Sequence, residues 1–458
     1  MSDHSHYTRM RAHAQSDAPS IALRDAPLVG SLFEFRNHRL ALQLRIAREC
    51  GDLGRFHIGP IPVYAVSSAE LAHQVLVEHA DAFVKSRGLA KIARPMLGDG
   101  LLTSEHDKHK MQRKLIAPAF THRRIASYAS AMAELTERAA AALEEGAVVD
   151  VADKMMRLTL AIVGKTLFDA DVASDADEVG AAITAANHYV SEQVTRLPTP
   201  IWLPTRKNRA ARRAIATIDR VVYRLIAARR AAATDVGDVL STLVSARDEV
   251  TGVGMPDRQI RDEAVTLFLA GHETTANALA WSFHLLGRHP DVAARLADEA
   301  RAVLAGRPPA MDDLPRLPTA LLVLKEAMRL YPPAYMVGRQ AERAVPLGPV
   351  VLRPGDTVFV NIYAMHRRAD YFDAPDQFRP ERFTPEREKL LVRGAYLPFG
   401  GGPRICIGNH FALMEGQLIL ASLAQRLRFV PLDDRPVVPE PLVTLRPKGG
   451  LPMRVARI

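Results

Sequence analysis

The sequence predicts a mainly α-helical protein with a smaller share of β-strand. Long stretches with helical character recur along the chain, at residues 127–168, 177–194, 206–232, 257–288 and 411–427. Strand-like segments are short and fewer, at residues 55–58, 63–66, 350–352 and 357–362. Residues 85–103 are punctuated by Gly and Pro, which predicts a loop, and their apolar character predicts that this loop lines a cavity.

Composition narrows the possible partners of this chain. Hydrophobic residues make up 48% and charged residues 24% of the 458 residues, as in soluble globular proteins. Lys and Arg number 60 against 51 Asp and Glu, a net charge of +9 that is spread along the chain. A basic face can dock an acidic protein or an anionic surface. No motif with interleaved basic and aromatic residues is present, so we expect no nucleic-acid partner.

The ends and the cysteines of the chain bear on its location. No apolar run reaches the roughly 18 residues that a membrane span requires, so no membrane anchor is expected. The polar start of the chain lacks the apolar stretch of a secretory signal and predicts a flexible tail over residues 1–25. Of the two cysteines, Cys50 has no predicted disulfide partner, which favours a reducing, cytoplasmic location.

The glycine-rich stretch from Phe399 to Gly408 contains the other cysteine, Cys406, just before an apolar helical run. Backbone N–H groups at a helix start favour the thiolate form of such a cysteine, and a thiolate is a metal ligand. The glycines let the backbone pass close to a large flat group. A buried structural cysteine is the alternative. Phosphate binding is excluded, because the Walker lysine and the Rossmann spacing are missing.

This stretch resembles the haem-binding loop of the cytochromes P450. Its pattern is Phe-x-x-Gly-x-Arg/His-x-Cys-x-Gly, and its fixed positions are filled by Phe399, Gly402, Arg404, Cys406 and Gly408. The resemblance implies haem b (iron protoporphyrin IX) as cofactor, with Cys406 as the iron ligand and Phe399, Arg404 and Gly408 in the binding loop. It implies no bound flavin or nicotinamide.

His109 and Arg113 lie four residues apart and share one face of a predicted helix, an arrangement that suits a carboxylate. A solvated basic helix face is the alternative. The resemblance implies that both bind the haem propionates, as does Arg339 further along the chain.

The segment Ala270-Gly-His-Glu-Thr-Thr275 interrupts an otherwise apolar helix. Threonine side chains that bond to i−4 carbonyls can open a helix and form a groove. A buried, satisfied threonine is the bland alternative, and a zinc-protease motif is excluded because the second histidine is replaced by Ala276. The resemblance implies that Thr274 hydrogen-bonds the oxygen substrate and that Glu273 relays protons.

Glu326 and Arg329 are spaced to pair on one helix, just before Leu-Tyr-Pro-Pro. The resemblance implies a structural role, in which the pair binds Arg382 and holds the cysteine loop. It also implies that the helix–loop–helix over residues 177–232 forms a lid. Apolar residues are expected to line the substrate pocket: Leu267, Phe268, Ala270, Ala334, Met336, Val337 and Val443.

The resemblance therefore implies a single P450 domain over residues 26–458, with a large helical region, a small β-rich lobe and the haem between them. A soluble, bacterial-type, monomeric monooxygenase is expected, with O2 as co-substrate and a fatty acid, terpenoid, steroid or polyketide as substrate. Because the chain ends soon after Cys406, electrons are expected from a separate ferredoxin or flavodoxin with its reductase, docked near residues 108–114. A peroxide-driven peroxygenase and a non-catalytic haem-binding protein are the alternatives.

Overall fold

The computed structural model describes residues 21–458 except 171–175, 196–198, 233–235 and 248–251. Its α-helices are α1 (Leu32–Asn37), α2 (Arg39–Cys50), α3 (Ala69–His73), α4 (Arg87–Leu97), α5 (His106–Ile116), α6 (His122–Ala141), α7 (Val151–Phe168), α8 (Ala176–Thr195), α9 (Arg206–Ala232), α10 (Val239–Ser245), α11 (Asp257–Arg288), α12 (Pro290–Leu304), α13 (Pro318–Leu330), α14 (Ile362–Met365), α15 (Pro385–Glu388) and α16 (Asn409–Ala424). Its strands are β1 (Leu53–Ile58), β2 (Ile61–Val66), β3 (Phe83–Lys85), β4 (Val148–Asp150), β5 (Val337–Ala341), β6 (Val345–Leu347), β7 (Val350–Leu352), β8 (Thr357–Val360), β9 (Leu427–Pro431), β10 (Pro439–Pro441), β11 (Leu445–Pro447) and β12 (Pro452–Arg457).

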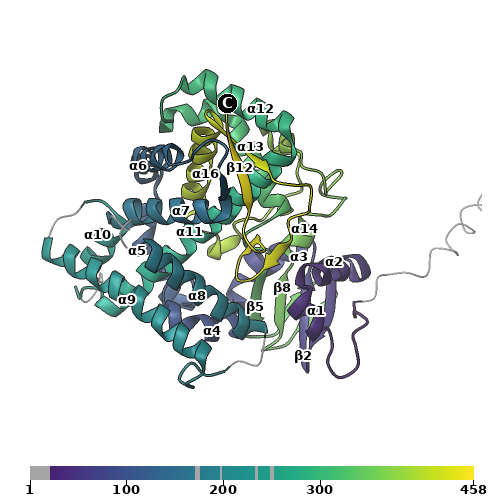
Figure 1. Ribbon diagram of the computed structural model, residues 1–458. Helices are drawn as coiled ribbons and strands as arrows, with labels where there is room; N and C mark the ends of the chain where they lie inside the picture. Colours follow the sequence, from purple (N-terminus) through teal and green to yellow (C-terminus); the bar gives the residue numbers. More distant parts are fainter. Residues whose placement is uncertain (1–20, 171–175, 196–198, 233–235, 248–251) are drawn as a thin grey trace, which may run out of the picture.

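The 32-residue helix α11 forms the centre of the helical region. It packs against α7, α9, α13 and α16, and most of its side chains are buried, which explains its nearly continuous apolar sequence. Figure 1 shows α8 and α9 side by side at the edge of this region, where they form the predicted helix–loop–helix. The predicted bounds of α11, residues 257–288, are confirmed.

The β-rich lobe is a five-stranded sheet with the order β1-β2-β8-β5-β3. Strands β1 and β2 form an antiparallel hairpin around the turn at Gly59, and β2 pairs in parallel with β8. Its apolar core is separate from that of the helices. Figure 1 shows this lobe beside the helical region, and the smaller sheets β4-β12-β9, β6-β7 and β10-β11 complete the fold. The predicted fold class is confirmed.

Three predictions of local structure need correction. The predicted helix over residues 127–168 is two helices, α6 and α7, because the chain turns at Gly146 (φ 77°) and enters β4. The predicted loop over residues 85–103 contains α4, with Pro95 inside it. The predicted flexible tail extends too far, because Ile21 and Leu23 hydrogen-bond to Arg55 of β1; residues 1–20 lie outside the described residues.

Glu326 and Arg329 of α13 are fully buried and paired. The guanidinium of Arg329 donates to both carboxylate oxygens of Glu326, at 2.7 and 2.8 Å, and to the carbonyl oxygen of His366 at 2.8 Å. Arg382 lies 3.4 Å from the same carboxylate. The His366 ring accepts a hydrogen bond from the backbone N–H of Leu397, which leads into the cysteine loop. These contacts form a network that connects α13 to the cysteine loop. Its hydrogen bonds compensate the buried charges of Glu326 and Arg329, which would be unfavourable without such partners.

Both cysteines are free thiols. None of the helices within the described residues combines the length and the apolarity that a membrane span requires.

Candidate active site

Cys406 lies between a short 3-10 turn (Gly402–Arg404) and the start of α16. Its backbone N–H donates to the carbonyl oxygen of Phe399 at 3.0 Å, which closes the loop. Gly402 has a φ of 66°, and a Cβ there would lie 1.8 Å from the carbonyl oxygen of Leu76. Only glycine fits this position, so the motif glycine sets the path of the loop.

Cys406 is exposed to solvent, although enough protein surrounds its thiol for burial to affect its pKa. Burial raises the pKa of the thiol, while a hydrogen bond from the backbone N–H of Gly408 and the charge of Arg113 lower it. Arg113 is held against the loop by a 2.8 Å hydrogen bond to the carbonyl oxygen of Ile405. The N–H donor and the cation are the groups that favour a thiolate, and a positively charged metal ion adds to them.

The four predicted basic residues of the cofactor site converge beside this loop: His109 and Arg113 from α5, Arg339 from β5 and Arg404 from the loop itself. His109 is buried, and its pKa is lowered to about 3, first by burial and then by neighbouring positive charges. Burial and then the charge of Arg404 lower the pKa of Arg339 to about 10, against the opposing charge of Glu105. The structure therefore brings these residues together.

Lys85 is a fifth basic residue of the cluster, which the sequence analysis missed. It lies on β3, directly opposite Arg339 in the antiparallel pairing with β5. Burial and the charge of Arg404 lower the pKa of Lys85 to about 7. No sequence signal connects Lys85 with the other four residues, because only the pairing of β3 with β5 places it there.

Glu105 is the acidic side chain that opposes this cluster. It forms an ion pair with Arg404 and accepts a 2.8 Å hydrogen bond from the backbone N–H of Lys85. His109 is uncharged at neutral pH, whereas Arg113 and Arg339 donate to backbone carbonyl oxygens and form no ion pair with a carboxylate of the described residues. Their positive charge is unfavourable in this partly buried cluster unless further anions bind. The two propionates of a haem supply two such anions, so the donor set fits this cofactor.

The middle of α11 presents a small accessible patch. Ala270 is exposed, and Gly271 and Thr274 are partly accessible, in a helix that is otherwise buried here. The hydroxyl of Thr274 donates to the carbonyl oxygen of Ala270 at 2.8 Å, and that of Thr275 to Gly271 at 3.2 Å. The expected bonds to i−4 carbonyls are present, but the helix stays continuous, so the predicted opening of the helix is wrong.

Glu273 is buried, with 6% of its surface exposed. It precedes Thr274, but its carboxylate faces the hairpin β10–β11, where it accepts a 2.6 Å hydrogen bond from the hydroxyl of Thr444. Glu273 and Thr274 are therefore adjacent in sequence, but their side chains contact different neighbours.

The predicted substrate-pocket residues fall into two groups. Ala270 and Val443 are exposed, and the other accessible members are partly so: Ala334, Met336 and Val337. The prediction that Phe268 lines the pocket is wrong, because its ring packs on Phe168 of α7, with the ring centroids 5.2 Å apart. A residue two positions from Ala270 points about 200° away around the helix. Leu267 shares the face of Ala270 but is 6% exposed.

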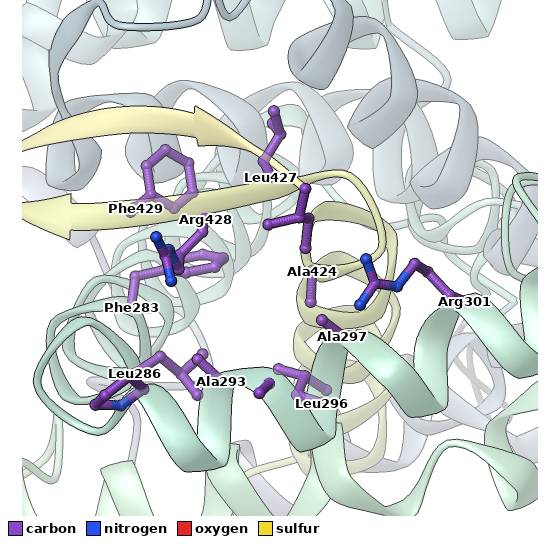
Figure 2. Close-up of a pocket in the computed structure, with 13 residues that line it drawn as sticks. Phe283, Leu286, Ala293, Leu296, Ala297, Arg301, Ala424, Leu427, Arg428 and Phe429 are labelled. Atoms are coloured by element: carbon purple, nitrogen blue, oxygen red, sulfur yellow. The ribbon is translucent and has the colours of Figure 1, made fainter.

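A separate apolar hollow of about 130 Å³ lies between the end of α11, α12, the end of α16 and β9. Figure 2 shows Phe283, Leu286 and Phe429 around it, with Arg301 and Arg428 at its edge. None of the predicted site residues lines it, so it is not the candidate active site.

A cysteine in a glycine-rich loop before a helix, a basic cluster beside that loop, and a long central helix that carries a buried acid next to an accessible alcohol are together the features of the class of haem-thiolate proteins. The family model described as Cytochrome P450 matches residues 22–453. The chain belongs to the cytochrome P450 family.

Proteins with similar sequences support this family assignment. The chain is 40% identical to cyclooctatin synthase of Streptomyces melanosporofaciens over 86% of each chain. It is 39% identical to cyclooctat-9-en-7-ol 5-monooxygenase of the same organism over 83% of each chain. It is 33% identical to pentalenene oxygenase of Streptomyces avermitilis, over 94% of this chain and 95% of the relative.

The fold matches a solved structure, the crystal structure of the cytochrome P450DA heme domain, with a TM-score of 0.87. That match is 28% identical and covers 95% of this chain and 97% of the other. These findings confirm the predicted family, and with it a haem-binding P450 monooxygenase.

Proposed function

We propose that this enzyme inserts one atom of O2 into a terpenoid hydrocarbon or alcohol, by hydroxylation or epoxidation. The reaction consumes O2, two electrons and two protons for each substrate molecule, and it releases the oxygenated product and water. The observation that carries the proposal is the joint presence of the Cys406 loop, the basic cluster and the Glu273–Thr274 segment in one fold.

The substrate class is supported by the relatives and by the site. Two relatives are named for pentalenene and for cyclooctat-9-en-7-ol. The accessible residues Ala270, Ala334 and Val443 carry no polar side-chain groups, so an apolar molecule is favoured over a polar one. A fatty acid, a steroid or a polyketide is the less favoured substrate within the same apolar range.

The residues of the site have distinct tasks in this proposal. When bound, the haem supplies the activation of oxygen. Cys406 would be its iron ligand, and the basic cluster with Lys85 would hold its propionates. The hydroxyl of Thr274 donates its proton to the carbonyl oxygen of Ala270, so its oxygen is the acceptor on the accessible patch of α11, and it becomes a donor when that proton turns away from the carbonyl. The carboxyl group of Glu273 binds and releases a proton one residue away.

Electrons are proposed to come from a separate ferredoxin or flavodoxin and its reductase. The exposed side of α5 carries Lys108, Lys110 and Lys114 around Met111, which is 46% exposed. Lys108 forms an ion pair with Asp99 at 2.7 Å and Lys110 with Asp107 at 3.0 Å, so the three lysines exceed these two carboxylates by one positive charge. A face with this positive excess attracts an acidic electron carrier. We further propose a monomer in the cytoplasm, a reducing compartment in which the two free cysteines are stable.

The first test is a titration of the purified haem-containing protein. Pentalenene, cyclooctat-9-en-7-ol and lauric acid are added separately, and the shift of the haem from low to high spin is followed in the absorption spectrum. A shift with either terpenoid and none with lauric acid is expected. Cys406→Ser, the control, is expected to lose the absorption band of the reduced carbon-monoxide complex that haem-thiolate proteins share.

The second test is turnover of the terpenoid that shifts the spectrum. NADPH with a surrogate ferredoxin and reductase is compared with hydrogen peroxide alone. Product with NADPH supports the monooxygenase. Product only with peroxide indicates a peroxygenase, and a spectral response without any product indicates a binding protein; either result contradicts the proposal.

A further inference from the structure

One face of α11 is hydrogen-bonded to the hairpin β10–β11 over three consecutive turns. Glu273, Asn277 and Trp281 are spaced four residues apart and so lie on one face. Glu273 accepts from the hydroxyl of Thr444 at 2.6 Å, and the side-chain amide of Asn277 donates to that hydroxyl oxygen at 3.0 Å. The indole N–H of Trp281 donates to the carbonyl oxygen of Leu445 at 3.1 Å. The acid of the acid–alcohol segment is thus one end of a hydrogen-bonded stripe.

Burial fixes the direction of the proton in this network. Glu273, Asn277 and Thr444 are each less than 8% exposed. Because the amide N–H of Asn277 occupies the oxygen of Thr444, the single hydroxyl proton of Thr444 is directed to the carboxylate. A buried carboxyl group that accepts a hydrogen bond from such a donor has one strongly preferred position.

The hairpin itself is anchored from its other sides. The backbone N–H of Leu445 donates to the carbonyl oxygen of Pro333 at 3.0 Å. The hydroxyl of Tyr335 donates to the carbonyl oxygen of Leu442 at 2.7 Å, and Arg39 donates to that of Pro441 at 3.1 Å. These bonds hold residues 441–445 on both sides of one accessible side chain.

That accessible side chain is Val443, which is 39% exposed. It is the neighbour of Thr444 in the chain and lies on the predicted substrate surface. A molecule that contacts Val443 therefore acts directly on Thr444, which hydrogen-bonds the carboxylate of Glu273, because the two residues are adjacent in the chain.

We propose that Thr444 is a positioning residue for Glu273, and that the hairpin links substrate contact at Val443 to proton delivery. This inference rests on the proposed monooxygenase function. Thr444 holds the carboxylate so that protons pass from a fixed group to the Thr274 side of α11. When the hold is lost, proton transfer to oxygen becomes mistimed, and electrons leave as hydrogen peroxide without product.

The test compares Thr444→Val, Thr444→Ser and Thr166→Val in the haem-containing protein. Valine keeps the shape and removes the hydroxyl, serine restores the hydroxyl, and Thr166 is a matched control. It is buried, and its hydroxyl donates to the carbonyl oxygen of Ile162 at 2.7 Å, on a different helix. Haem content and the substrate-induced spin shift are measured first, and all three variants are expected to retain both.

Product formed per NADPH, peroxide release and the solvent deuterium isotope effect are measured next. Thr444→Val is expected to lose product yield several-fold, to release more peroxide and to change the isotope effect. Thr444→Ser recovers most of the yield, and Thr166→Val keeps it. Wild-type yield and isotope effect in Thr444→Val would show that the hydroxyl is only structural and would overturn the proposal.

A second readout needs no turnover. Urea unfolding of Thr444→Val, Glu273→Gln and the double variant forms a double-mutant cycle. The two changes are expected to be non-additive by about tenfold in the unfolding equilibrium constant, as for a hydrogen bond to a charged group. Additive changes overturn the contact itself. If wild type gives no product with NADPH, the function fails while this cycle still decides whether Thr444 holds Glu273.

Discussion

Glu263 of α11 offers a sharp test of how burial controls charge in this fold. Its side chain is fully buried and accepts hydrogen bonds from the backbone N–H of Leu101 and from the amide of Gln259, both at 2.8 Å. Burial raises its pKa from 4.5 to about 7; these hydrogen bonds and Lys108 oppose that shift, and Asp262 adds to it. The proposed change is Glu263→Gln, which keeps the shape and an acceptor oxygen for Leu101.

The sign of the effect follows from linkage. Between pH 4.5 and 7 the folded state binds more protons at Glu263 than the unfolded state does. Stability from this residue is therefore lost as pH rises through that window. At about 1.4 kcal/mol per pKa unit, the loss is roughly 2–3 kcal/mol between pH 5 and pH 8. Glutamine carries no charge at either pH. The unfolding free energy of Glu263→Gln relative to wild type is therefore expected to rise by that amount between pH 5 and pH 8.

The assay is urea unfolding, followed by circular dichroism, at pH 5 and pH 8. His272, His284 and His366 have lowered pKa values and produce the opposite slope, but they are present in both proteins and cancel in the difference. Asp313→Asn is the control, because the guanidinium of Arg307 donates to both its carboxylate oxygens and holds its pKa below 3.8. Asp313 is therefore ionised at both pH values, and its loss is expected to destabilise equally at both. An equal difference between wild type and Glu263→Gln at pH 5 and pH 8 would refute the argument.

Three further predictions concern the cysteine loop, the buried ion pair of α13 and the tryptophan Trp202. Gly402→Ala is expected to abolish haem incorporation, measured by haem absorbance per protein, because its Cβ would collide with the carbonyl oxygen of Leu76. Arg329→Lys is expected to lose about 3–5 kcal/mol of unfolding free energy in urea, because one ammonium cannot replace the five donors of a buried guanidinium. Trp202 is 69% exposed and Trp281 fully buried, so Trp202→Phe is expected to remove the part of the fluorescence that acrylamide quenches.

Matched controls separate these effects from general damage. Gly400 also has a positive φ, but a Cβ there meets no atom within 4 Å, so Gly400→Ala is expected to keep most of the haem. Arg343 is exposed, and Arg343→Lys is expected to change stability by less than about 0.5 kcal/mol. Haem loss in both glycine variants, equal losses in both arginine variants, or quenching that persists in Trp202→Phe would contradict the respective prediction.

The sequence by itself determined the features that depend on neighbours along the chain. The loop around Cys406, the bounds of α11 and the spacing of Glu326 and Arg329 are local patterns, set by glycine geometry and helical periodicity. The same locality explains the errors. The turn at Gly146 was hidden in a helical composition.

Only the tertiary structure decided which residues from distant segments meet. Lys85 joins the basic cluster through the pairing of β3 with β5, and Thr444 reaches Glu273 because a hairpin near the end of the chain packs on α11. The direction of Phe268 was set by packing on Phe168. Such contacts depend on loop closure and on competition for buried space, and neither leaves a short-range pattern in the sequence.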